Sequence, residues 1–185
     1  MKIMKTIIEK IDKNQKNTDI IREAGRILKE GGLVAFPTET VYGLGADALN
    51  EDAAKKIYAA KGRPSDNPLI IHITNMKALD KIVSEVPEKA VKVAEKYWPG
   101  PLTMIFNKSD IVPYGTTGGL DTVAVRMPVD EIEREVIDAG GGYIAAPSAN
   151  TSGRPSPTTA QHVAEDLTGR VDMIVDGGAV EIGVE

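Results

Sequence analysis

Several short polar segments combine the cationic, hydroxyl and amide side chains that bind phosphates and sugars. Segment 61–68, Lys-Gly-Arg-Pro-Ser-Asp-Asn-Pro, carries the cations Lys61 and Arg63, with Asn67 a few residues later. Its two prolines favour an extended backbone, in which residues two apart point the same way. We therefore expect both cations on one side, where they can meet a phosphate. The alternative interpretation is an ordinary solvated loop.

A second segment, 145–156, is rich in small hydroxyl and amide residues: Ala-Ala-Pro-Ser-Ala-Asn-Thr-Ser-Gly-Arg-Pro-Ser. Ser148 and Asn150 are two residues apart, so they can face the same ligand. Ser148 lacks the Gly-x-Ser-x-Gly elbow that exposes a serine nucleophile in α/β-hydrolases. The segment is therefore interpreted either as a ligand-binding loop or as a capping loop.

The densest polar segment is 37–45, Pro-Thr-Glu-Thr-Val-Tyr-Gly-Leu-Gly. Its glycines formally match a dinucleotide fingerprint, but they neither directly follow the expected strand nor open a helix, so we reject that match. Two interpretations remain. One is an ordinary turn whose glycines adopt positive φ. The other is a loop whose Thr38, Thr40 and Tyr42 present their hydroxyls along one side.

Two expected strands carry polar side chains. His72 lies in an apolar run, where it is either a hydrogen-bonded core histidine or a donor or acceptor that faces a ligand. Thr122, Ala124 and Arg126 alternate with apolar residues and therefore share one face of their strand. An arginine at the end of a strand can pair with a carboxylate, either structural or carried by a substrate.

Helical and strand patterns alternate along the chain and must position these residues. Helical spacing and capping residues predict helices at 18–30, from Asn50 to about 58, from Asn75 to 83, at 87–97, at 130–138 and at 159–168. Short apolar runs predict strands at 33–36, 69–73, 102–106, 122–126, 143–146 and 171–175. This alternation predicts a single-domain α/β fold with a mixed sheet over residues 1–185.

The loops rich in glycine and proline lie just after these strands, where open α/β sheets usually bind ligands. We expect four of them to converge on one cavity: 37–45, 62–68, 114–119 and 147–157.

Composition excludes several classes of function. The 185 residues contain no cysteine and two histidines, which excludes disulfides, thiol catalysis, cysteine-ligated zinc and a three-histidine metal site. A net charge of −5 argues against a generally basic nucleic-acid binder. No apolar stretch reaches membrane-spanning length, and the charged start does not match a signal peptide. We expect a soluble, cytoplasmic protein without a membrane partner.

Five motifs occur in a specific order: the segments 37–45, 61–68, 98–103, 125–128 and 147–150. In this order and spacing, from about Thr18 to Gly178, the chain resembles the YrdC-like family, the threonylcarbamoyl-AMP synthases. The resemblance implies a twisted mixed sheet with flanking helices around a deep basic cavity. It also implies that L-threonine, bicarbonate or CO₂, and ATP react to give L-threonylcarbamoyl-AMP and pyrophosphate.

The resemblance further implies roles for individual residues. Threonine would be held by Thr40, His72, Arg126 and the backbone at Ala146. ATP would be held by Lys61, Arg63, Asn67, Thr122, Ser148, Asn150 and Ser156. Lys61 and Arg63 would act catalytically on the phosphates, and replacing either should weaken ATP binding without unfolding the protein. Mg²⁺ would accompany ATP by bridging its phosphates, without a metal cage made by the protein.

The product would pass to a transferase complex that modifies the adenosine beside the tRNA anticodon, and weak contact with tRNA or double-stranded RNA stays open. One alternative is an RNA-binding module without turnover, against which the net charge argues. Another is a carbamoyl-transfer domain of the hydrogenase-maturation type, which resembles this chain but carries cysteine-rich zinc modules and an acylphosphatase segment. The chain stops where relatives usually continue into a further strand. We therefore expect a C-terminally truncated fragment, with a natural short chain as the alternative.

Overall fold

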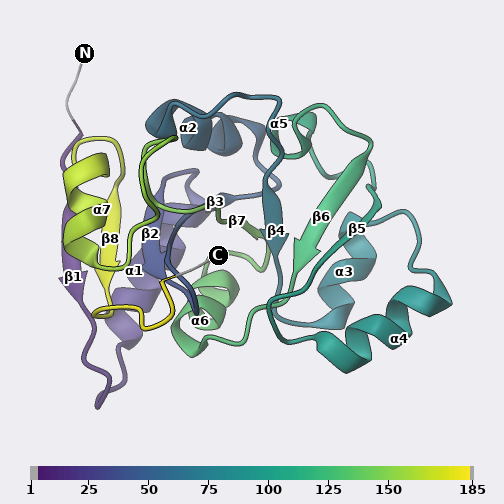
Figure 1. Ribbon diagram of the computed structural model, residues 1–185, viewed down its shortest axis with the longest axis horizontal. Helices are drawn as coiled ribbons and strands as arrows, with labels where there is room; N and C mark the ends of the chain where they lie inside the picture. Colours follow the sequence, from purple (N-terminus) through teal and green to yellow (C-terminus); the bar gives the residue numbers. More distant parts are fainter. Residues whose placement is uncertain (1–3, 184–185) are drawn as a thin grey trace.

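Eight strands form one mixed sheet in the computed structural model, which describes residues 4–183 (Figure 1). They are β1 (Ile7–Lys10), β2 (Val34–Pro37), β3 (Tyr42–Asp47), β4 (Ile70–His72), β5 (Thr103–Asn107), β6 (Thr122–Arg126), β7 (Ile144–Ala145) and β8 (Met173–Asp176). Their order across the sheet is β1-β8-β2-β3-β7-β4-β6-β5. Three neighbouring pairs are parallel, β1–β8, β2–β8 and β4–β6, and the others are antiparallel. The expected α/β fold with a mixed sheet is confirmed.

Seven helices flank this sheet in the described part of the chain: α1 (Thr18–Lys29), α2 (Glu51–Lys61), α3 (Met76–Ile82), α4 (Glu88–Tyr97), α5 (Tyr114–Thr117), α6 (Glu131–Ala139) and α7 (Ala160–Leu167). Side chains of Asn50, Asn75, Asp130 and Thr159 each accept a backbone N–H three residues on, as N-caps do. The sequence predicted every helix except the four-residue α5. Asn17 makes no capping hydrogen bond through its side chain.

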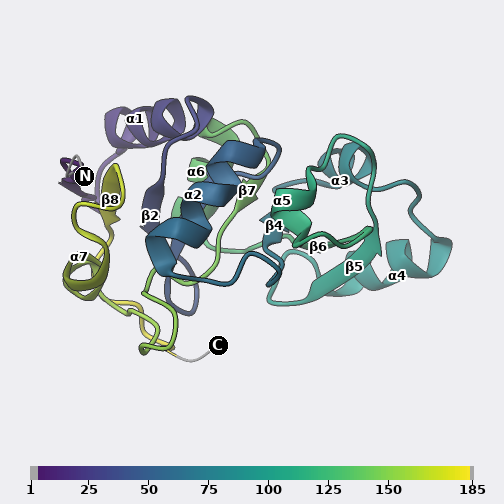
Figure 2. The ribbon, with the colours of Figure 1, turned by 90° about the horizontal axis from the view of Figure 1, so that it is seen from above.

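Alternation along the strands divides the buried side chains into two clusters, one on each face of the sheet. On β2, Val34 and Phe36 belong to the cluster that packs against α1 and α6. Ala35 and the preceding Leu33 belong to the cluster on the other face, which packs against α2 and α7. Figure 2 shows α1 and α7 on opposite sides of β2 and β8.

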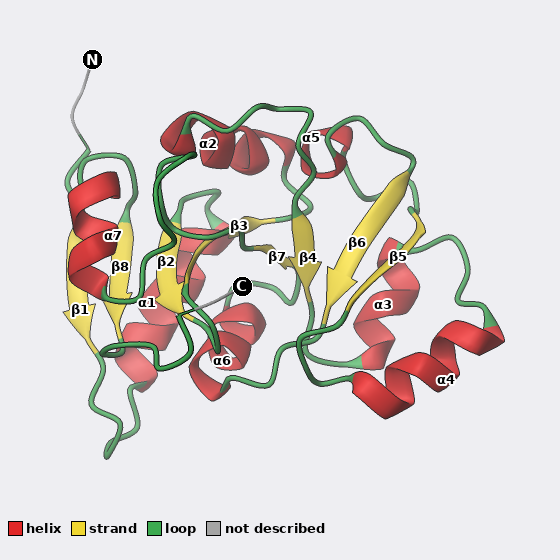
Figure 3. Ribbon diagram, viewed as in Figure 1, coloured by secondary structure: helices red, strands yellow, loops and turns green. Residues whose placement is uncertain are grey.

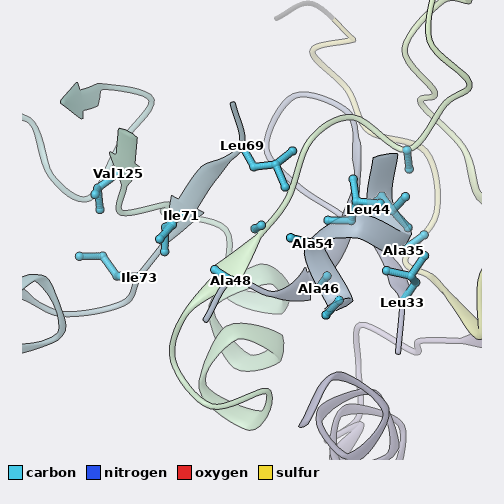
Figure 4. Packing of buried hydrophobic residues seen from close by; sticks show 14 of the residues in the cluster. Leu33, Ala35, Leu44, Ala46, Ala48, Ala54, Leu69, Ile71, Ile73 and Val125 are labelled. Atoms are coloured by element: carbon cyan, nitrogen blue, oxygen red, sulfur yellow. The ribbon is translucent and has the colours of Figure 1, made fainter. Parts of the chain in front are cut away.

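The second cluster is aliphatic and continues across the sheet. Figure 4 shows Leu44 and Ala46 of β3 near Ala54 of α2, with Ile71 of β4 further along. Figure 3 shows β4, β6 and β5 at the far end of the sheet, with α3 and α4 beside them. Through these two packed faces the helices hold the strand ends in fixed positions.

The strand β3 corrects our expectation that all of segment 37–45 is loop. Gly45 lies within the strand without positive φ, and a Cβ there would lie 2.5 Å from Cε1 of Phe36. This glycine is therefore required by close packing and not by a turn. Tyr42 is completely buried, and its hydroxyl donates to the carbonyl oxygen of Gly178 at 2.6 Å. Burial raises its pKa to about 12, so Tyr42 is a core residue and not part of a row of hydroxyls.

Candidate functional site

A small cleft lies where β4 and β6 end. These parallel neighbours run in the same direction (Figure 1), and their last residues, His72 and Arg126, are register partners. Thr40 lies in the turn between β2 and β3, and Ala146 follows β7 directly. Together with Ser148, these four residues line the cleft. The structure thus brings together every residue that the resemblance assigned to threonine.

The charge of this cleft is mixed. Its lining includes one arginine, Arg126, and two glutamates, Glu39 and Glu133. Nε of Arg126 donates to Oγ1 of Thr103 at 3.3 Å. One oxygen of Glu39 accepts the N–H of Val129 at 2.7 Å. The resemblance implied a deep basic cavity, but the described residues that line this cleft carry groups of both signs. Such a mixture suits a zwitterionic amino acid.

His72 and Glu133 form a buried pair at this cleft. Nδ1 lies 2.7 Å from Oε1, and the two side chains are 5% and 2% exposed. Asp130 caps α6 by accepting the Glu133 N–H. A glutamate at this third position commonly caps the helix start itself, but here the carboxylate turns inward to the histidine. Sequence reasoning missed Glu133, although it shares a helical face with the buried Val136 and Ile137.

The side chain of Lys61 ties the end of α2 to the loop after β7. Lys61 is 3% exposed. Its ammonium donates to the carbonyl oxygens of Ser148 and Asn150, the latter at 2.7 Å, and to Oδ1 of Asn150 at 3.3 Å. The N–H of Ser152 donates back to the carbonyl oxygen of Lys61 at 2.8 Å. Lys61 therefore fixes the loop that carries two expected ATP contacts.

The expectation that Lys61 and Arg63 point the same way along an extended segment is wrong. Gly62 ends α2 in the left-handed conformation, with φ of 62°, so the chain changes direction between the two cations. The guanidinium of Arg63 donates to the carbonyl oxygens of Asn67 at 3.2 Å and Pro68 at 2.8 Å. Burial lowers the pKa of this guanidinium from its ordinary value, but arginine stays charged in proteins.

The other expected ATP residues lie outside the cleft. Thr122 begins β6, at the opposite end of that strand from Arg126, and lines a separate hollow of about 370 Å³ beside α4 and β5. Asn67 is exposed. Ser156 precedes Pro157, whose carbonyl oxygen accepts the N–H of Tyr42 at 2.8 Å.

The four loops do not converge on one cavity in this structure. Segments 62–68 and 114–119 lie beside each other, because a Cβ on Gly118 would come within 2.8 Å of the carbonyl oxygen of Asp66. Neither segment lines the cleft, whereas 37–45 and 147–157 both do. This expectation was therefore correct for two loops and wrong for the other two.

The loop after β7 is held in place by Asp166 of α7. Its carboxylate accepts the N–H of Thr151 at 2.9 Å and the Thr151 hydroxyl at 3.1 Å, and it pairs with Arg154 at 3.0 Å. Burial raises the pKa of Asp166, but the hydrogen bonds from Thr151 and the charges of Arg154 and Arg170 outweigh burial and leave it below the ordinary value. The carboxylate is therefore a stabilising anchor for the loop.

The cleft encloses about 40 Å³. One molecule in liquid water occupies about 30 Å³. One wall is the turn at Thr40, whose carbonyl oxygen accepts the N–H of Gly183 at 2.9 Å. A larger hollow of about 1050 Å³ lies between α1 and α6, but its lining contains none of the residues expected at the site.

Comparisons with known proteins agree with this fold. The family model Sua5/yciO/yrdC, described as "Telomere recombination", matches residues 26–185. A threonylcarbamoyl-AMP synthase of Pyrococcus abyssi is 59% identical over 165 residues, covering 89% of this chain and 48% of the relative. One of Bacillus subtilis is 52% identical over 186 residues, covering all of this chain and 54% of the relative.

A solved structure of P. abyssi Sua5 complexed with L-threonine superimposes with a TM-score of 0.88 at 54% identity. It covers all of this chain and 53% of that protein. The chain belongs to the Sua5/yciO/yrdC family. It spans about half the length of the curated relatives named here.

No helix within residues 4–183 is long and apolar enough to cross a membrane. The same residues contain no group of three or more histidine, cysteine, aspartate or glutamate side chains that could hold a metal ion.

Proposed function

We propose that this chain is an L-threonylcarbamoyladenylate synthase that joins L-threonine, bicarbonate or CO₂, and ATP. The observation that carries this proposal is that Thr40, His72, Arg126 and Ala146 meet in one cleft with groups of both charges. It is supported by close relatives named threonylcarbamoyl-AMP synthase and by a related structure complexed with L-threonine.

Threonine would bind with its carboxylate on Arg126, because a planar guanidinium pairs with a carboxylate through two parallel hydrogen bonds. Thr40, His72 and the backbone at Ala146 then surround the amine and the side chain. The unprotonated amine would attack CO₂, so that a nitrogen–carbon bond forms, one carbon–oxygen π bond opens and the nitrogen releases a proton to solvent, which gives a carbamate. A site that hydrogen-bonds the threonine hydroxyl rejects valine, since a buried polar group would lose its partner.

The carbamate oxygen would then attack the α-phosphorus of ATP, and the bond to the leaving pyrophosphate breaks. The enzyme needs no nucleophile of its own for this step, so Ser148 serves as a ligand. Catalysis rests on positioning and on stabilising charge at the phosphates. Arg63 would contact the phosphates, and Lys61 would hold the loop of Ser148 and Asn150 while adding positive charge beside it.

The remaining ATP ligands would be Asn67, Thr122 and Ser156, which requires ATP to extend beyond the cleft along the face that Thr122 and Arg126 share. Mg²⁺ would enter with ATP as part of the substrate, because it prefers phosphate and water oxygens. The product would pass in the cytoplasm to a tRNA threonylcarbamoyl transferase complex. Direct contact of this chain with tRNA would be weak, in keeping with its net charge of −5.

Pyrophosphate release tests this proposal. The purified chain is incubated with ATP and Mg²⁺, and threonine and bicarbonate are added singly and together. We expect release only when both are present. Release that ignores threonine would contradict the substrate assignment. Salt-dependent retention of RNA without any turnover would instead favour the RNA-binding alternative.

A further inference from the structure

We propose that Glu133 is a positioning residue that fixes the ring and the proton of His72, so that Nε2 faces the cleft as a hydrogen-bond acceptor. The hydrogen-bonded pair of Glu133 and His72 is inferred from the geometry alone. The ligand that Nε2 would meet in the cleft rests on the proposed function, which supplies an amino acid as substrate.

A hydrogen bond joins His72 to Glu133 in the core. Nδ1 of His72 lies 2.7 Å from Oε1 of Glu133, and both side chains are almost completely buried. An ionised carboxylate can only accept hydrogen bonds. The proton of a neutral imidazole is therefore held on Nδ1, which leaves the lone pair on Nε2.

The other ring nitrogen of His72, Nε2, makes no hydrogen bond to Glu133. Within the described residues, the imidazole makes its hydrogen bond through Nδ1 alone. The one fully buried side-chain polar atom without a hydrogen bond in that part of the chain is the hydroxyl oxygen of Tyr58. Nε2 is thus not sealed in the core, and since His72 lines the cleft, the atom is accessible from there.

Hydrogen bonds hold the helix of Glu133 against β4. Its N–H donates to the Asp130 carboxylate at 2.9 Å in the first turn of α6. The adjacent Arg134 donates to the carbonyl oxygens of Pro128 at 2.8 Å and Thr74 at 2.9 Å. Thr74 lies just beyond the end of β4, so these bonds fix α6 against the strand that carries the histidine.

The neighbours of His72 identify what the acceptor would meet. Arg126 is its register partner on the adjacent strand, where parallel strands lie about 4.8 Å apart. An amino acid whose carboxylate pairs with Arg126 places its α-ammonium and its β-substituent within reach of Nε2. The acceptor therefore selects a hydrogen-bond donor, which in threonine is either the hydroxyl or the ammonium group.

The test of the pair uses the free protein and needs no substrate. Long-range ¹H–¹⁵N correlation spectra report which ring nitrogen carries the proton. The chain has two histidines, and His162, exposed on α7, is the internal reference. We expect His72 of the unaltered chain to be protonated on Nδ1. A proton on Nε2, with or without one on Nδ1, would overturn the proposal regardless of the reaction that the enzyme catalyses.

A variant extends the test to function. Glu133→Gln keeps the shape of the side chain, but its amide can donate to Nδ1 and so permit the other tautomer. The control is Glu135→Gln on the exposed face of the same helix. We expect Glu133→Gln to change the His72 tautomer and raise the Kd for L-threonine about tenfold, with the Kd for ATP unchanged. The control should change neither. An unaltered threonine Kd in Glu133→Gln would overturn the proposal.

Calorimetric titration with L-valine, which has nearly the same shape but no hydroxyl, distinguishes the two donors. If the hydroxyl binds Nε2, Glu133→Gln weakens threonine but leaves valine unchanged. If the ammonium binds Nε2, the variant weakens both amino acids to the same extent. Either result supports the positioning role. A protein that binds neither amino acid but shows the expected tautomer would count against the proposed function and against Nε2 as a substrate acceptor, while the pair itself would stand.

Discussion

Replacing Lys61 should unfold part of the site as well as weaken catalysis. The sequence places this lysine in a polar segment and predicts that Lys61→Ala leaves the fold intact. The structure instead buries it at the end of α2, with its ammonium on two carbonyl oxygens and one amide oxygen of Ser148 and Asn150. Truncation leaves these acceptors without their donor, in a place that water reaches poorly.

The magnitude follows from these three contacts. Each buried acceptor that loses its partner costs about 1–3 kcal/mol, and removing a buried charge returns part of that cost. We therefore expect a loss of about 2–4 kcal/mol in the free energy of unfolding. For a chain of this length this corresponds to a decrease of roughly 5–15 °C in Tm.

Thermal unfolding followed by circular dichroism measures this loss. The matched control is Lys56→Ala on the same helix, because the exposed Lys56 makes one hydrogen bond, to the carbonyl oxygen of Gly31 at 2.8 Å. The control should lose no more than about 1 kcal/mol. If Lys61→Ala melts within about 2 °C of the unaltered chain, the assignment of Lys61 as a structural tie is wrong.

Other substitutions separate the remaining roles. Arg63→Ala should lower kcat/KM by a factor that corresponds to about 2–4 kcal/mol of lost transition-state stabilisation, with little change in Tm. Unchanged turnover would show that Arg63 takes no part in catalysis. Arg126→Ala should weaken threonine binding, and an unchanged calorimetric affinity would exclude it from the site. Gly45→Ala should lower the free energy of unfolding by about 1–3 kcal/mol, because the added Cβ would lie 2.5 Å from the Phe36 ring. An unchanged Tm in this variant would contradict that packing. The lowered pKa of Asp166 means that its stabilisation is complete above the ordinary pKa of 3.8 and is lost as the pH falls below it. Asp166→Asn should therefore have a lower free energy of unfolding than the unaltered chain at pH 7. At a pH well below 3.8 the two proteins should be equally stable, and a difference that persists there would refute this.

Periodic apolar patterns and capping residues predicted six helices, and short apolar runs predicted six strands, most of which are largely buried in the sheet. β1 was missed because all four of its residues are exposed, so no alternation marks it. β3 was missed because its glycines and Pro37 signal a turn in sequence, whereas Gly45 is needed to pass over Phe36. Such close approach depends on a second strand and is not visible in local sequence.

The candidate site likewise contains residues that the sequence could select and contacts that it could not predict. The resemblance to a known family selected Thr40, His72 and Arg126, which the structure places together, whereas the residue types alone left the role of each open. The directions of Lys61 and Arg63 could not be predicted, since a single left-handed glycine separates them. Glu133 could have been found as a charged residue on an apolar helical face, but its partner lies 61 residues away.

The proposed reaction makes its most direct prediction about the product. The chain is incubated with ATP, Mg²⁺, L-threonine and ¹³C-bicarbonate, and the nucleotides are analysed by mass spectrometry. We expect an adenylate that contains both threonine and the labelled carbon, formed only when all substrates are present. An adenylate without the label, or AMP formed equally without threonine, would contradict it.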